Sequence, residues 1–227
     1  TLFFKIAVLL LEWFAHDPRE VGWYTTAYKY IDAVGIIPAY FTLAIFPLMS
    51  RYAATAKGSL YKAYQLAIKL LLIVAMPVAF FTWALSRPLI MLLGGSQYLP
   101  YSAYVLQVVI WYMPFGFINS VTQYVLIALD QQRFLTRAFA IGLAFNVAAN
   151  VLLITRFGYM ASAYVAVLSE VVLLIPFLIG IRKHLARIPL LKLGWMPLVC
   201  SAPLGALLYL LPSRYIPLSM ALGIAIY

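Results

Sequence analysis

The fold is decided by long apolar runs, of which residues 160–181 are the clearest: MASAYVAVLSEVVLLIPFLIGI. Glu170 is the one charged residue in this stretch, which is long enough for a membrane helix of about 20 residues. Across all 227 residues, 66% are hydrophobic and 10% are charged, with a mean hydropathy of +0.98. So few charges would not cover a soluble domain, in which about 25% of residues are charged. The composition excludes a soluble enzyme, a secreted disulfide scaffold and a disordered tail, and it predicts an integral membrane protein.

Apolar segments alternate with short polar connectors along the whole chain. Because every backbone polar group in lipid needs an internal partner, we expect these segments to be helices. β-Barrel strands would be shorter and would alternate in polarity. We therefore predict an all-α bundle of about eight spans, the first and last truncated, from a longer protein. The segments are 1–15, 23–49, 65–86, 102–129, 137–155, 160–181, 193–211 and 216–227. Prolines that should bend these helices are Pro38, Pro77, Pro114, Pro176 and Pro203.

Lysine and arginine are divided unevenly between the two sides of this bundle. Alternate connectors carry ten of the 16 basic residues, and the remaining connectors carry four. The positive-inside rule makes the richer side cytoplasmic and explains the net charge of +10 without nucleic acid as a partner. The ten are Arg51, Lys57, Lys62, Lys69, Arg133, Arg137, Arg182, Lys183, Arg187 and Lys192.

The second segment carries the clearest intramembrane charges. Lys29 and Asp32 are three residues apart and share a helix face with Thr25 and Tyr28. Ionisable residues inside spans usually face protein or a water-filled cavity. We interpret Lys29 as a cavity-lining cation that binds an anionic substrate, with Asp32 holding its side chain. A structural ion pair near the outer end of the span is the alternative.

Other spans carry isolated polar groups. Glu170 is a candidate for proton or cation coupling, or for a hydrogen bond that holds the bundle together. Asn119 and Gln123 are four residues apart, as are Asn146 and Asn150. Either pair can contact sugar hydroxyls, but amides in membrane helices are more often interhelical hydrogen-bonding groups.

Patterns typical of enzymes are missing. The sequence holds two histidines, far apart, and one cysteine, Cys200, so it predicts neither a zinc site nor an internal disulfide. It has no phosphate-binding loop and no GxSxG motif. The connector 16–20 (HDPRE) places Asp17 and Glu20 outside, where we expect a solvated turn that caps the second span. We expect no enzyme, no metal and no cofactor.

Five stretches resemble motifs of the bacterial polysaccharide and O-antigen flippases. Residues 21–29 (VGWYTTAYK) and 45–51 (IFPLMSR) are similar to the start and end of one helix of that family. Residues 88–102, 126–132 (LIALDQQ) and 157–170 (FGYMASAYVAVLSE) resemble three further motifs, in the same order and spacing. These motifs imply, by resemblance, that the chain is a member of the multidrug/oligosaccharidyl-lipid/polysaccharide exporter superfamily.

This resemblance implies a two-lobe, 14-helix transporter of the inner (plasma) membrane. Residues 1–183 would be the carboxy-terminal six-helix lobe, and residues 184–227 the additional helix pair, its last helix truncated. Two departures are the absence of the family's "riD" pattern at residues 4–7 (FKIA) and Ala161 in place of a glycine.

The resemblance also implies a function and partners. We expect translocation of polyprenyl-diphosphate-linked oligosaccharide, with Lys29 facing the diphosphate and the last helix pair offering a groove for the lipid tail. Expected partners are this substrate, membrane lipids and other polysaccharide-assembly proteins. The alternatives are a cation-coupled multidrug extruder of the same superfamily and a membrane glycosyltransferase or polymerase that uses Asp17 and Glu20.

Overall fold

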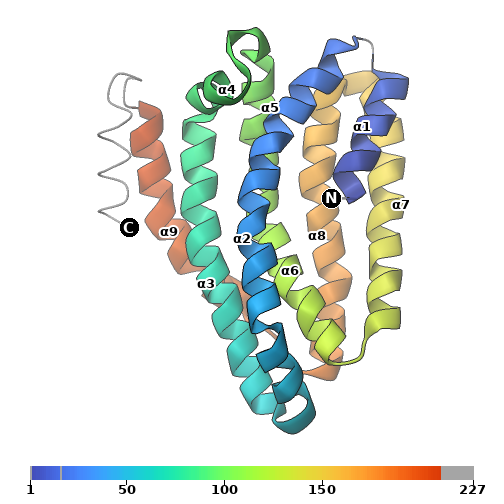
Figure 1. Ribbon diagram of the computed structural model, residues 1–227, viewed down its shortest axis with the longest axis vertical. Coiled ribbons are helices and arrows are strands. Elements are labelled where there is room, and N and C mark those ends of the chain that lie inside the picture. The colour runs from blue at the N-terminus through green and yellow to red at the C-terminus, as the bar shows by residue number, and fades with distance from the viewer. Residues whose placement is uncertain (1, 16, 211–227) are drawn as a thin grey trace.

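The computed structural model describes residues 2–15 and 17–210, which form an elongated helical bundle without strands in this part of the chain (Figure 1). The all-α expectation is confirmed. The elements are α1 (Leu2–Phe14), α2 (Arg19–Thr55), α3 (Lys57–Ala84), α4 (Ser86–Gly94), the 3-10 helix η1 (Ser96–Tyr98), α5 (Tyr101–Val109), α6 (Tyr112–Ala128), α7 (Gln132–Phe157), α8 (Tyr159–His184) and α9 (Leu190–Leu210).

The helices follow the apolar segments of the sequence. The described residues of the first seven predicted segments are almost all helical, and the eighth, 216–227, lies outside the described residues. In the described part of the chain, α2, α3, α7 and α8 are long and apolar enough to cross a membrane. Counting α5 and α6 as one broken span gives five. The number eight stays a prediction, and α1, with 13 residues, is shorter than the about 20 that a span requires.

The broken span has a local cause. α5 and α6 are bent by 42° at Ile110 and Trp111. Pro114 has no N–H to donate to the carbonyl of Ile110, four residues earlier, and the N–H of Met113 donates to that oxygen instead (3.0 Å). The prediction of a bend near Pro114 therefore agrees with the structure, whereas α2, α3, α8 and α9 continue through their internal prolines.

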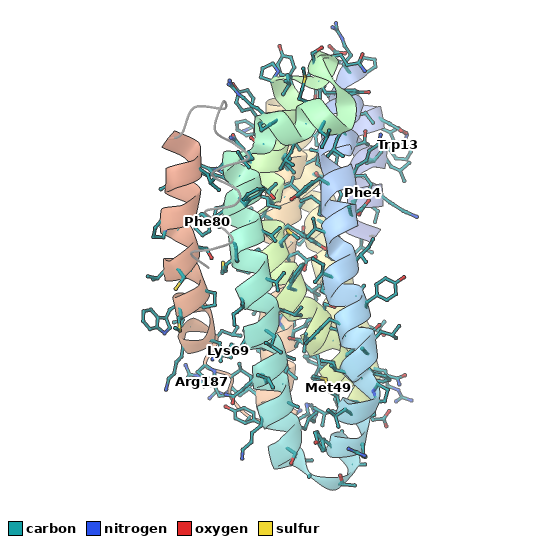
Figure 2. All side chains as sticks on the ribbon, turned by 60° about the vertical axis from the view of Figure 1, so that its left-hand side comes forward. Phe4, Trp13, Met49, Lys69, Phe80 and Arg187 are labelled. Carbon is teal, nitrogen blue, oxygen red and sulfur yellow. The ribbon has the colours of Figure 1, made fainter. Side chains whose placement is uncertain are left out.

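Hydroxyl and aromatic side chains join the helices inside the bundle. The hydroxyls of Tyr64 on α3 and Thr122 on α6 are hydrogen-bonded at 2.7 Å, and both side chains are buried. Thr82 on α3 donates to the phenol oxygen of Tyr30 on α2 (2.8 Å). The two most extensive helix contacts are α7 with α8 and α3 with α9. α9 packs on the outside of the bundle (Figure 2).

The two ends of the bundle differ in charge. The turns at 55–57, 129–131 and 185–189 lie at the lower end in Figure 1, and the amino ends of α2 and α8 lie at the upper end. The lower end is the one that the lysine and arginine pattern assigns to the cytoplasm. Lys69 and Arg187 both lie in the lower part of the molecule in Figure 2.

At the upper end, one carboxylate joins two helices that are distant in sequence. Glu20, in the first turn of α2, is buried, and its Oε2 accepts a hydrogen bond from the backbone N–H of Tyr159, the first residue of α8 (2.8 Å). Gly158 precedes α8 with φ of +59°, and a Cβ there would stand 2.8 Å from Glu20 Oε2. Glycine therefore permits both the left-handed backbone and the close approach of the carboxylate.

Candidate functional site

A cavity of about 580 Å³ lies inside the bundle, among α1, α2, α6, α7 and α8. Most of its wall is apolar or aromatic. Five polar side chains line the rest: Asn119, Ser120, Gln123, Thr136 and Glu170. The volume falls within the range of about 300–1,000 Å³ typical of small-molecule sites, and a mostly apolar wall with a few polar groups is typical as well.

Asn119 and Glu170 form the polar contact at the centre of this wall. Asn119 Nδ2 donates to Glu170 Oε2 (2.7 Å) and to the Glu170 backbone oxygen (2.9 Å), so the amide joins α6 to α8. Both side chains are buried. The amide oxygen of Asn119 is buried and has no hydrogen-bond partner among the described residues. An unpaired buried acceptor is rare in native proteins.

Gln123 lies one turn after Asn119 on α6 and also lines the pocket. Its side chain is half-buried and makes no hydrogen bond within the described part of the chain. The sequence prediction grouped these two residues on one face by their spacing, and the structure brings both to the same pocket as Glu170. Their role there stays a prediction.

The second amide pair holds helices together. Asn146 Nδ2 donates to the Ser169 hydroxyl on α8 (2.8 Å), and the Ser162 hydroxyl donates to Asn150 Oδ1 (2.9 Å). All four side chains are buried. Neither amide lines the pocket, so Asn146 and Asn150 are interhelical hydrogen-bonding groups, as the sequence reading favoured.

Tyr28 and Thr25 do not reach the pocket. Tyr28 is buried and stacks on Phe4 of α1, with ring centroids 4.0 Å apart and an angle of 20° between the rings. Tyr24 completes this aromatic cluster (5.8 Å from Phe4). The Thr25 hydroxyl donates to the backbone oxygen of Val21 (2.8 Å). The cause is the packing of α1 against this part of α2, which sequence spacing within one helix does not reveal.

Lys29 lies on a different face of α2 from the pocket. Its side chain is exposed, and the same exposed face continues through Ile36 and Tyr40, which are 54% and 68% exposed. Asp32 is also exposed and does not line the pocket, although Gly35, one turn later on α2, does. Among the described residues no ion pair joins Lys29 to Asp32 within 4.0 Å, so the expected holding contact is not formed. Exposed charges gain little from pairing.

The acidic residues of the upper connector serve the local structure. Asp17 Oδ1 accepts a hydrogen bond from the backbone N–H of Arg19 (2.8 Å), and the carboxylate pairs with the Arg19 side chain (3.2 Å). This agrees with a turn that caps the second span. Glu20 was expected to be solvated in that turn. It is instead buried, and its carboxylate contacts the first residue of α8. His16 lies outside the described residues.

Two polar residues of the pocket, Ser120 and Thr136, were not predicted from the sequence. Ser120 follows Asn119 directly, and its hydroxyl is 3.4 Å from that of Thr42 on α2. Thr136 is in the first turns of α7 and donates to the backbone oxygen of Gln132 (3.1 Å). Ser120 belongs to the face that also carries Asn119 and Gln123, so its position on α6 was a usable signal. Thr136 offered none, because hydroxyls are common near helix ends.

Comparison with known proteins supports a transporter. The MatE family model matches residues 1–152. The fold is similar to a solved structure titled "Lipid II flippase MurJ, inward closed conformation", with a TM-score of 0.79 and 15% sequence identity. The match covers 100% of this chain and 49% of that one, so the chain spans about half the length of that protein. No curated protein matches.

The family, the apolar helices and the fold agree with one another. The chain is a multi-pass protein of the inner membrane with a transporter fold, and the similarity to MurJ is one of fold. The family match extends over α1 to α6 and most of α7, which together build the greater part of the pocket wall. The chain therefore belongs to the MatE family.

Proposed function

We propose that this chain is the carboxy-terminal part of a flippase that moves polyprenyl-diphosphate-linked oligosaccharide across the inner membrane. In this proposal residues 1–183 form one six-helix lobe and residues 184–227 the additional helix pair. The single observation that carries the proposal is the buried, unpartnered amide oxygen of Asn119 in the wall of an intramembrane pocket. A hydroxyl-rich ligand would supply the missing hydrogen bond.

The pocket chemistry suits a sugar. Amide and hydroxyl groups of Asn119, Ser120, Gln123 and Thr136 both donate and accept, as sugar hydroxyls do. The aromatic rings of Phe117, Phe139 and Phe177 give apolar surface on which the faces of sugar rings can pack. These groups are held on helices rather than loops, so their positions are defined by the packing of the bundle.

Lys29 has the chemistry for the diphosphate. Its ammonium is exposed on α2 and has no ion pair within the described residues. A lysine binds phosphate as a point charge and does not need two-point geometry. In a two-lobe transporter, rocking of the lobes around a site near the middle of the membrane exposes it to each side in turn. The charged head then never crosses bare hydrocarbon, while the isoprenoid tail stays in lipid.

The test uses the full-length protein in proteoliposomes with a fluorescent polyprenyl-diphosphate oligosaccharide, whose translocation is followed by loss of accessibility to an external quencher. Lys29→Ala should weaken the apparent affinity about tenfold or more, the value of a charged hydrogen bond, and Lys29→Arg should retain most of it. Lys69→Ala, which removes an exposed lysine from α3, is the matched control. Normal translocation by Lys29→Ala would remove the assigned role.

The sugar contact is tested separately. Gln123→Leu should weaken binding about fivefold, the value of one neutral hydrogen bond. Gln107→Leu is the control, because Gln107 donates to the Trp83 backbone oxygen (3.3 Å) and does not line the pocket. An equal effect of the two changes would show that Gln123 acts through folding and not through the substrate.

A cation-coupled multidrug extruder is the second candidate, and one observation favours it. Glu170 places a carboxylate in a pocket whose wall includes Phe117, Phe139 and Phe177, an environment that suits lipophilic cations. On this reading Glu170→Gln abolishes resistance to cationic drugs in cells. On the flippase reading the same variant leaves drug resistance unchanged, because its main effect is on the contact with Asn119.

A further inference from the structure

A second hollow lies at the lower, cytoplasmic end of the bundle, between the end of α8, the linker 185–189 and the start of α9. Its volume is about 730 Å³. Arg182, Arg187 and Lys192 line it, and all three side chains are exposed. We call this hollow the basic groove.

The positive charge of the basic groove has no opposing charge. None of its lining residues is acidic, and none of its three cations forms an ion pair within the described part of the chain. The whole sequence has only six aspartates and glutamates. Arg182 lies in the last turn of α8, where the helix dipole favours a cation. Arg187 and Lys192 lie beyond that helix, so the dipole of α8 does not account for their position.

The remaining wall of the basic groove is apolar. Ile179 and Leu191 are 58% and 91% exposed, and Ile188 forms a buried part of the floor. Such exposure is costly in water but suits the acyl chains of a bilayer. Cations and exposed aliphatic side chains that line the same hollow match an amphiphile with an anionic head, and not a soluble anion alone.

The shape of the basic groove is held by a contact that is distant in sequence. The hydroxyl of Tyr61 on α3 donates to the backbone oxygen of Arg187 (3.0 Å), and Gln65 Nε2 donates to the same hydroxyl (3.0 Å). This pair fixes the linker, and with it the backbone of Arg187, against α3. A preformed site loses less entropy on binding.

We propose that the basic groove binds the phosphate head of an anionic phospholipid from the cytoplasmic leaflet, with its acyl chains along the apolar wall. Basic hollows between membrane helices on the cytoplasmic side are suited to such heads, and that leaflet provides them. The bound lipid fills the angle between α8 and α9. This site is separate from the pocket that contains Asn119, and it does not depend on the transported substrate.

The experiment is native mass spectrometry of the full-length protein, delipidated in detergent and titrated with phosphatidylglycerol or phosphatidylcholine. The wild type should retain phosphatidylglycerol selectively. The triple variant Arg182→Gln, Arg187→Gln, Lys192→Gln should bind it about 100-fold more weakly, since each cation near an anionic surface contributes about fivefold. Its melting temperature without lipid should equal that of the wild type, because the three side chains are exposed.

A second triple variant controls for charge at the same end of the bundle. Lys57→Gln, Arg133→Gln, Arg137→Gln removes the same number of lysines and arginines, all exposed and none lining the basic groove. It should bind phosphatidylglycerol as the wild type does. Equal loss in both triple variants, or equal retention of phosphatidylcholine, would overturn the proposal.

Two competition arms identify the source of the phosphate. Inorganic phosphate at millimolar concentration should not displace the phospholipid, because it has no acyl chains to occupy the apolar wall. A short polyprenyl diphosphate should also leave the bound phospholipid in place. Displacement by inorganic phosphate would make the groove a site for soluble anions, and displacement by polyprenyl diphosphate would make it a substrate site. Either result overturns the assignment to a phospholipid.

Discussion

Glu20 offers the sharpest test of how this bundle is held together. Its buried carboxylate accepts the N–H of Tyr159, one of the four N–H groups at the start of α8 that have no partner within the helix. Losing a hydrogen bond to a charged group costs about 1.5–3 kcal/mol. Losing a negative charge at a helix amino end costs about 0.3–1 kcal/mol more. We therefore expect Glu20→Ala to lower the free energy of unfolding by about 2–4 kcal/mol.

The conservative change separates these two contributions. Glu20→Gln keeps an acceptor for Tyr159 and loses the charge, so it should cost about 1 kcal/mol. The assay is titration of the full-length protein in detergent micelles with a denaturing surfactant, followed by circular dichroism. Glu12→Ala, which removes an exposed carboxylate from α1, is the control and should change little. The reasoning would be refuted if Glu20→Ala were no more destabilising than Glu12→Ala.

Three further predictions concern two helix contacts and the start of α3. A double-mutant cycle of Asn146→Ala and Ser169→Ala, measured in the same surfactant titration, should give a coupling of about 0.6 kcal/mol, typical of hydrogen bonds between membrane helices; no coupling would contradict the 2.8 Å contact. Gly205→Ala should lower stability by about 1–3 kcal/mol, since a Cβ there would stand 2.9 Å from Phe80 Cβ. Gly58→Ala, with nothing within 4 Å of the added Cβ, should instead raise stability by up to about 1 kcal/mol, and a loss there would argue against the helical start of α3.

Much of the fold could be predicted because the solvent of a membrane protein imposes simple rules. A run such as 160–181 must be helical in lipid whatever its neighbours are, and α8 covers it entirely. The break before Pro114 follows from one missing N–H. Likewise, Asn119 and Gln123 reach one pocket because four residues make about one helical turn.

What could not be predicted depends on which helices become neighbours. Helical spacing grouped Tyr28 with Lys29, but it carries no information that Phe4 of α1 packs on the tyrosine. Glu20 was assigned to a solvated turn because its partner, the N–H of Tyr159, is 139 residues away. The spacing within α2 likewise carries no information that Lys29 and Asp32 lie outside the pocket, on an exposed part of the helix.

The hydrogen bond from Tyr61 to the Arg187 backbone has a mechanical consequence. It attaches the linker before α9 to the lower part of α3, and the close approach of Gly205 to Phe80 holds α9 itself against α3 farther along. α9 is thereby held to α3 as one rigid unit. In the proposed transport cycle the two helices would move together, and so would the phospholipid proposed to bind beside α9.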